Sequence, residues 1–382
     1  MQKKFIALAV AGLVSGAAFA QSNVTVYGVA DATFDVASAT GAANNSNANR
    51  GSFTRLNSNS SYIGFKGTEA LGNGLNAVFQ IESGVGLDGN ASTFGVTRDS
   101  FVGLSGGFGT VVGGFLTGPT RALGSAIDLN SGATGPGVNS SLIGKVAGVN
   151  TNGAGIFDTR FSNAIAYVSP NFSGLTATVA YVSGENKTRD DQVAVKQNLK
   201  GYDLGLVYKN GPIVAGLTYG KVDTGINGSN ANTLTTFGAL DSIKVVRLAG
   251  AYTFNGGHKI TALYEQNKAD FAANGVNTNT KQNTWGIGGK FMVTSNGGLI
   301  AQYYQAQDAS GNRLATNSNT GARLYEIGYE HSLSKRTILK ASYARLDNKD
   351  NANFDFYIGA VGGGFGPGAK PSVWSAGMRH SF

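Results

Sequence analysis

The chain has 382 residues, including 57 glycines, six prolines and no cysteine, and its formal net charge at pH 7 is +8. No disulfide can stabilise this fold, and the positive charge is spread along the chain without a lysine or arginine block, which argues against a nucleic-acid-binding surface. An aromatic content of 10% and regular apolar segments argue against disorder, although glycine, asparagine and serine are frequent.

The first 20 residues have the pattern of a secretory signal peptide. A basic start with Lys3 and Lys4 precedes an apolar stretch, and the small-residue ending Ala18-Phe19-Ala20 predicts cleavage after Ala20. Setting this segment aside lowers the net charge from +8 to +6 and leaves residues 21–382 as a single exported domain. No later apolar run approaches the roughly 18 to 20 residues of a membrane-spanning helix, so an inner-membrane protein is excluded.

Short segments that alternate apolar and polar residues recur along the chain, and this period of two predicts β-strands. The last segment is typical: Trp374, Ala376 and Met378 alternate with small or polar residues, and the chain ends on Phe382. About sixteen strands are predicted, starting near residues 23, 58, 74, 98, 109, 158, 174, 199, 212, 243, 258, 281, 298, 321, 336 and 371.

The connections between these strands alternate in length. Tight Asn/Gly turns are predicted at 171–174, 209–211, 255–257, 295–297 and 332–336, and long polar stretches at 37–57, 223–241, 305–319 and 347–370. Short turns on one side and long loops on the other indicate an up-and-down meander with two different ends.

The pattern as a whole predicts an all-β fold, a transmembrane antiparallel β-barrel of about 16 strands. In lipid every backbone amide must be paired, and a sheet avoids unpaired edges only by closing on itself. A soluble β-sandwich is the alternative, but it would need neither aromatic residues at the ends of its apolar face nor turns of two different lengths. Sixteen strands enclose an interior too wide for side chains to fill, which leaves a water-filled lumen.

Six stretches carry recognisable motifs: Val24–Ala32, Ser58–Gly84, Ser100–Val111, Ser169–Leu175, Leu333–Asn348 and Gly377–Phe382. Together they resemble the general diffusion porins of Gram-negative outer membranes, specifically the β-proteobacterial (Neisseria/Burkholderia-like) group. The resemblance implies a homotrimer of 16-stranded barrels with short periplasmic turns and long extracellular loops, in contact with outer-membrane lipid and lipopolysaccharide. It also implies that Phe382 is a signal read by the outer-membrane assembly machinery.

In this family the third long loop folds inward and narrows the pore, and the resemblance places that constriction loop at about residues 116–157. The loop holds few charges, among them Arg121 and Asp128. Asp128 is the expected acid on the loop side of the constriction. Arg98 and Arg160 are the expected bases on the opposing wall.

Two positions depart from the family pattern. Relatives usually have arginine where this chain has Tyr62 and Phe115, and strand parity predicts that both residues face the lumen. The transverse field between loop acids and wall arginines is therefore expected to be weaker here. Tyr62 and Phe115 could line a site for sugar-like or aromatic solutes, or simply pack against the loop. Arg98 and Arg160 could be paired without affecting selectivity, and Asp128 could be a solvated loop acid.

The leading hypothesis for function is a passive channel for small hydrophilic solutes and ions, with a weak preference for anions. The alternatives are a substrate-selective porin with an aromatic-lined constriction, and a surface adhesin or immune-facing barrel. No enzyme activity, cofactor or metal site is expected, because His258, His331 and His380 have no metal-ligand or catalytic-triad spacing.

Overall fold

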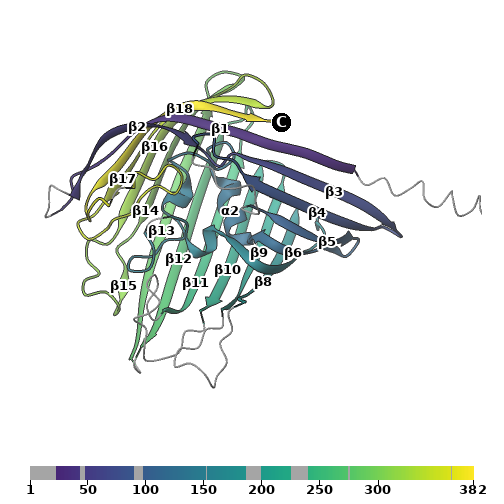
Figure 1. The fold of residues 1–382 in the computed structure, drawn as a ribbon, viewed down its shortest axis with the longest axis horizontal. Helices are drawn as coiled ribbons and strands as arrows, with labels where there is room; N and C mark the ends of the chain where they lie inside the picture. Colours follow the sequence, from purple (N-terminus) through teal and green to yellow (C-terminus); the bar gives the residue numbers. More distant parts are fainter. Residues whose placement is uncertain are drawn as a thin grey trace, which may run out of the picture.

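The computed structural model describes residues 23–43, 48–89, 98–151, 153–185, 199–224, 240–273, 276–362 and 364–382, so the predicted signal peptide lies outside the described residues. Its strands surround an interior that contains helix α2, as Figure 1 shows. The strands are β1 (Asn23–Thr40), β2 (Arg50–Ser58), β3 (Tyr62–Gly72), β4 (Leu75–Gly84), β5 (Ser100–Gly106), β6 (Gly109–Thr117), β7 (Arg160–Val168), β8 (Leu175–Ser183), β9 (Lys200–Asn210), β10 (Ile213–Asp223), β11 (Leu240–Thr253), β12 (Lys259–Ala273), β13 (Val276–Met292), β14 (Gly297–Ala306), β15 (Ser310–Gly311), β16 (Ala322–Ser332), β17 (Thr337–Asn348) and β18 (Lys370–Ser381).

Among the described residues, the long connection between β6 and β7 contains the helical elements that position the site. These are α2 (Pro119–Ile127) and two single 3-10 turns, Asn139–Ser141 and Ile156–Asp158. Within the described ranges, no helix has the length and apolar character needed to cross a bilayer.

All strands belong to one antiparallel sheet that closes on itself. The first strand pairs with the last, from Val29 opposite Ser381 to Thr40 opposite Lys370. On its other side β1 pairs with β3 through its first half and with β2 through its second half, so β2 and β3 are two parts of one interrupted strand. Because β15 is only a two-residue segment beside β13, the barrel has the sixteen strands predicted from the sequence.

The closing seam ends in a close contact between the two termini of the barrel, visible in Figure 1 where the C-terminus lies beside β1. The backbone groups of Gly28 and Phe382 exchange two hydrogen bonds of 3.1 Å. A Cβ atom at position 28 would lie 2.5 Å from the Phe382 ring, so only glycine leaves room for this aromatic.

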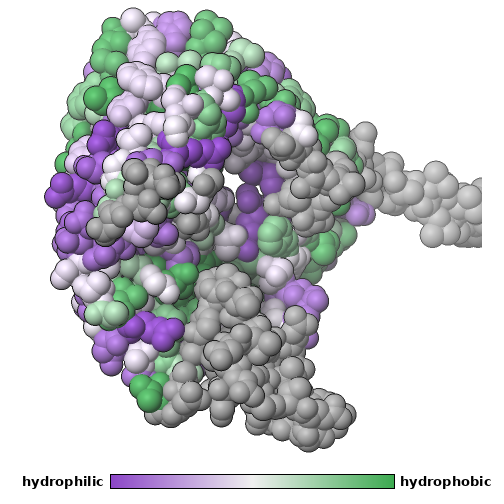
Figure 2. Space-filling view, turned by 60° about the vertical axis from the view of Figure 1, so that its left-hand side comes forward, coloured by the Kyte–Doolittle hydropathy of each residue, from purple (hydrophilic) through white to green (hydrophobic). Residues whose placement is uncertain are grey.

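Along the strands, side chains alternate between an apolar outer face and a polar inner face, as predicted. On β18, Trp374 is 64% exposed on the outer face, whereas Ser375 is buried and its hydroxyl donates to Asp35. Outward apolar residues recur on most other strands, for example Val26, Val102 and Ile327. Figure 2 shows an opening into the barrel whose visible lining is mainly hydrophilic.

The two ends of the barrel differ as the sequence predicts. Short turns join β3 to β4, β5 to β6, β7 to β8, β9 to β10, β11 to β12, β13 to β14 and β16 to β17 at one end of the barrel. The longer connections lie at the other end, where the connection between β12 and β13 is also found but is short.

One predicted long loop is wrong in large part. The stretch 37–57 is mostly strand, because β1 continues to Thr40 and β2 begins at Arg50. Its inner face carries small residues, Ala37 and Ala39, which are buried in a cluster with Phe354 and Phe356 of the connection between β17 and β18. Because the inner face of this strand end packs against another loop, apolar residues point inward here, and the sequence lacks the usual alternation of an apolar outer face with a polar inner face.

Candidate pore constriction

The connection between β6 and β7 folds into the lumen, and α2 lies inside the barrel in Figure 1. Its apolar residues Leu123 and Phe157 are almost fully buried against the inner wall. The wall is glycine at both contacts: a Cβ at Gly216 would lie 2.7 Å from Leu123, and one at Gly220 would lie 2.2 Å from Phe157. The inward-folded loop runs from residue 118 to residue 159, close to the predicted 116–157.

A carboxylate on the wall holds the start of α2. The N-cap residue Gly118 has no side chain that could bond to the free amides of the first turn. Asp203 of β9 supplies the missing acceptor: its carboxylate accepts the Thr120 N–H at 3.1 Å and the Thr120 hydroxyl at 2.6 Å. The negative charge also lies at the positive end of the helix dipole, which stabilises this contact.

The second anchor is a buried group of one cation and two acids. Arg247 of β11 is fully buried, and its guanidinium bonds to Asp158 at 2.5 and 3.0 Å and, through Nε, to Glu265 at 2.5 Å. It also donates to the Thr120 carbonyl at 2.7 Å, while Glu265 accepts the Gly144 N–H at 2.6 Å. Arg247 thus joins the start and the end of the loop, and its partner Glu265 holds the middle.

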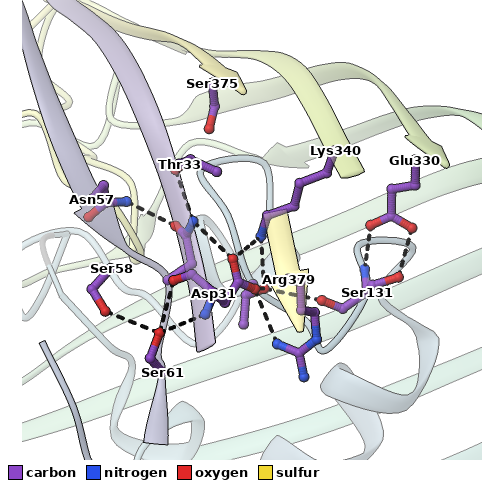
Figure 3. Close-up of polar contacts among 12 residues, drawn as sticks. Asp31, Thr33, Asn57, Ser58, Ser61, Ser131, Glu330, Lys340, Ser375 and Arg379 are labelled. Carbon is purple, nitrogen blue, oxygen red and sulfur yellow. Dashed lines mark hydrogen bonds and ion pairs between the residues drawn. The ribbon is translucent and has the colours of Figure 1, made fainter. Parts of the chain in front are cut away.

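The third anchor holds the central part of the loop, as Figure 3 shows. Asp31 of β1 pairs with Lys340 at 2.6 Å and with Arg379 at 3.1 Å, and it accepts the loop hydroxyl of Thr134 at 2.9 Å. Nearby, Glu330 accepts the N–H and the hydroxyl of Ser131 at 2.8 and 2.7 Å. The loop is therefore fixed to strands on both sides of the closing seam.

Arg98 and Tyr62 lie together on the wall. Tyr62 is opposite Val29 and shares the lumen face with Tyr27, whose ring it meets edge-on at 6.1 Å. The Arg98 guanidinium lies 4.3 Å from the centre of the Tyr62 ring and pairs with Glu82 at 3.3 Å. A cation from the segment before β5 thus lies over the aromatic ring of Tyr62.

The other two predicted arginines lie at the two ends of the constriction loop. Arg160 pairs with Asp99 at 2.6 Å, and the same carboxylate accepts the Thr117 N–H at 2.7 Å. Arg121 donates to the backbone carbonyl of Asp158 and to the hydroxyl of Tyr357, the latter at 3.3 Å. The influence of these arginines on selectivity stays a prediction.

Asp128 lies at the end of α2 and is only 6% exposed. Its carboxylate accepts the N–H groups of Asn130 and Asn139 at 2.9 and 2.7 Å, so it fixes the turn that follows the helix. Little of this carboxylate reaches the lumen, and its contribution to the field in the pore stays a prediction. Burial is the main cause that raises the pKa of Asp128, which lies outside the membrane-spanning strands, to about 6.

The predicted lumen position of Phe115 is wrong. Its neighbour Leu116 is 5% exposed and belongs to a buried cluster with Phe157 of the loop, so Leu116 faces inward. The register pairs Phe115 with Ser100 and leaves it on the opposite, outer face of β6. Strand parity misassigned Phe115 because its neighbours give no polar signal for the lumen face: Gly114 has no side chain, and Leu116 is apolar because it packs against the loop.

Sequence reasoning missed the three anchors. Their common signal is a charged residue at an inward position of an otherwise apolar strand: Asp203 follows Tyr202, and Arg247 follows Val246. Asp31 lies inside the first predicted strand in the same way. Such residues mark contacts to a segment inside the barrel, because a charge in a dry interface requires a partner.

Loop stability should depend on the titration of Asp128. Its folded-state pKa of about 6 lies above the ordinary 3.8, so its contribution to stability is full below 3.8 and is lost as the pH rises through about 6. We expect the wild type to lose unfolding free energy relative to Asp128→Asn between about pH 4 and about pH 7. Denaturant titrations of both proteins across this range measure the difference, and a difference independent of pH would refute the assignment.

Comparisons with known proteins agree with this architecture. The model of a family described as Gram-negative porin matches residues 7–351. The outer membrane porin protein 32 of Delftia acidovorans is 34% identical, with both chains covered completely, and the major outer membrane protein P.IB of Neisseria gonorrhoeae is 28% identical over 92% of this chain and 96% of its own. The solved anion-selective porin from Comamonas acidovorans is 30% identical, with a TM-score of 0.74, and the match covers 95% of this chain and 100% of that one.

The family match spans most of the chain, and the closed barrel with a loop in its lumen is the structure that such a channel requires. The relatives are named as outer-membrane porins. This chain therefore belongs to the Gram-negative porin family and is a channel-forming β-barrel of the outer membrane.

Proposed function

We propose that this porin is a passive diffusion channel for small hydrophilic solutes with a preference for anions. The observation that supports this preference is an unequal exposure of the two partners in the ion pairs of the inner wall. In five pairs the basic side chain is more exposed than its acidic partner: Arg55 with Asp35, Arg98 with Glu82, Lys290 with Glu330, Lys340 with Asp31 and Arg379 with Asp31.

The difference in exposure between base and acid is large in several of these pairs. Lys290 is 22% exposed against 5% for Glu330, and Arg98 is 20% exposed against 8% for Glu82. Arg160 is the exception, at 12% against 19% for Asp99, whereas the Arg247 group is buried on both sides. Because an exposed charge acts on a passing ion more strongly than one shielded by its partner, the lumen presents a net positive surface.

The anion-selective porin from Comamonas acidovorans, a solved relative, supports the same direction. The trimeric state expected from the family belongs to this proposal, with three equal conductance steps as its signature in planar bilayers. Selective uptake through an aromatic site receives less support, since Arg98 lies over the Tyr62 ring and Phe115 is on the outer face. The adhesin hypothesis depends on surface loops, of which residues 186–198 and 225–239 lie outside the described residues.

The reversal potential in a KCl gradient tests the preference. The wild type should show a larger permeability for chloride than for potassium, and Tyr62→Arg should increase that ratio because it adds an unpaired cation beside Arg98. Phe115→Leu is the control, because a change on the outer face should leave the ratio unaltered. A cation-selective wild type would refute the proposal. An effect of Phe115→Leu as large as that of Tyr62→Arg would refute the assigned geometry.

A further inference from the structure

Four lysines form a continuous row across four neighbouring strands. In the register of the sheet, Lys221 of β10 is opposite Lys244 of β11, which is opposite Lys268 of β12, which is opposite Lys281 of β13. Three strand spacings of about 4.8 Å make this row about 14 Å long. Like charges directly opposite one another destabilise a sheet, so an unbroken row of this kind calls for an explanation.

The row lies on the outer face of the barrel. Val222, beside Lys221, is 4% exposed and packs in the cluster that contains the loop residue Phe157, so Lys221 points away from the lumen. The same alternation places Lys244 and Lys268 outward, where their side chains are 35% and 40% exposed. None of the four belongs to the ion pairs of the inner wall.

The row lies on the long-loop side of an aromatic belt. Tyr219 is two residues from Lys221 on the side of the short turn, and Tyr264 is four residues from Lys268 in the same direction, opposite Trp285 of β13. Such aromatic residues mark the boundary between hydrocarbon and headgroups. The two to four residues between an aromatic residue and a lysine span about 7 to 13 Å along a tilted strand. The headgroup layer is about 5 to 8 Å thick, so the lysine ammonium groups lie at its level.

Neighbouring carboxylates neutralise the row only in part. Asp270 pairs with Lys244 at 3.0 Å and with Lys268 at 2.7 Å, and Asp223 pairs with Lys221 at 2.7 Å. Among the described residues, no ion pair is found for Lys281.

A hollow of about 330 Å³ opens beside Lys221, Lys244 and Asp270, and Asp241 also lines it. Lys200, opposite Asp223, adds a fifth cation, so the named residues comprise five lysines and three aspartates and carry an excess of positive charge.

We propose that this lysine row, Lys221, Lys244, Lys268 and Lys281, binds the phosphate groups of lipid A, the phosphorylated glycolipid anchor of lipopolysaccharide. A lysine ammonium is a compact charge suited to phosphate, and basic residues at a membrane surface attract anionic headgroups. The row is longer than one phosphate group, which suits a disaccharide that carries a phosphate at each end. The acyl chains would then lie along the apolar outer face of β10 to β13, below the aromatic belt.

Native mass spectrometry of the full barrel with added bisphosphorylated lipid A tests the proposal. The wild type should retain the lipid, and the variant Lys221→Ser/Lys244→Ser/Lys268→Ser/Lys281→Ser should bind it at least about tenfold more weakly. The control variant Lys209→Ser/Lys335→Ser removes two exposed lysines at the short-turn end and should bind like the wild type. Conductance should be equal in all three proteins, which shows that each is folded.

Three further experiments identify the ligand. Dephosphorylated lipid A should bind the wild type as weakly as it binds the four-lysine variant, and inorganic phosphate should not displace the lipid at equal concentration. Acetylation of the wild type should be reduced by lipid A at the four lysines but not at Lys209, a result that needs no variant. Equal binding by the four-lysine variant, binding that is independent of the lipid's phosphates, displacement by inorganic phosphate, or unprotected lysines would each overturn the proposal.

Discussion

Arg247→Met should release the constriction loop from the wall of the barrel. The substitution leaves Asp158 and Glu265 buried without the cation that compensates both, and it removes the donor to the Thr120 carbonyl. Breaking a buried ion pair by deleting one partner typically costs about 3 to 5 kcal/mol. We expect a loss of that size in the unfolding free energy measured in detergent, together with larger open-channel noise and a higher mean conductance in planar bilayers.

A second variant separates the role of charge from the role of packing. Arg247→Met/Asp158→Asn/Glu265→Gln replaces the group by neutral side chains of similar size, and such replacements are often close to neutral in stability. This variant should recover most of the lost stability and the quiet current of the wild type. If Arg247→Met conducts as quietly as the wild type, the arginine does not hold the loop.

Deleting Phe382 should reduce the yield of closed barrels far more than it alters the conductance of those that form. The deletion removes two backbone hydrogen bonds to Gly28 and the ring that lies against that glycine. At about 1 kcal/mol for each bond, the seam loses about 2 kcal/mol before the ring contact is counted. The yield of heat-resistant barrels after refolding into detergent, and after expression in cells, measures the effect.

Phe382→Tyr provides the matched control, because it keeps the backbone bonds and the aromatic ring. A comparison of refolding with expression also separates two causes. A defect in both settings reflects the lost contacts with β1, whereas a defect confined to cells reflects recognition by the assembly machinery. Normal yields of the deletion variant in both settings would contradict the importance of the terminal residue.

The sequence predicted the barrel well because lipid imposes a strict alternation on each strand. Trp374 and Met378 show the outer face of β18, and tight turns such as Lys209 to Gly211 show where strands reverse. The prediction was wrong at residues 37–57, where the inner faces of the strand ends are covered by another loop. There the burial that shapes the sequence comes from protein rather than from lipid.

The constriction could be predicted only in part, because its contacts join residues that are distant in sequence. The loop itself was recognisable, but the pairing of Thr120 with Asp203 depends on how the loop enters the lumen. Phe115 was placed on the wrong face because its neighbours carry no polar signal. A charged residue on an inward position predicts that a partner exists, whereas the identity of that partner needs the three-dimensional structure.

The seam between β1 and β18 has a consequence for the order in which this protein can mature. Apart from β15 and the divided strand β2–β3, every other pair of bonded strands is adjacent in sequence, so hairpins can form locally, whereas the seam joins the two ends of the chain. Closing a loop of roughly 350 residues costs on the order of 5 kcal/mol in entropy, and it requires the last strand, β18, to be present. A chain that stops short of β18 exposes two open edges, at β1 and β17, and open edges promote aggregation. Only a chain that includes β18 can therefore pair both edges and avoid this risk of aggregation.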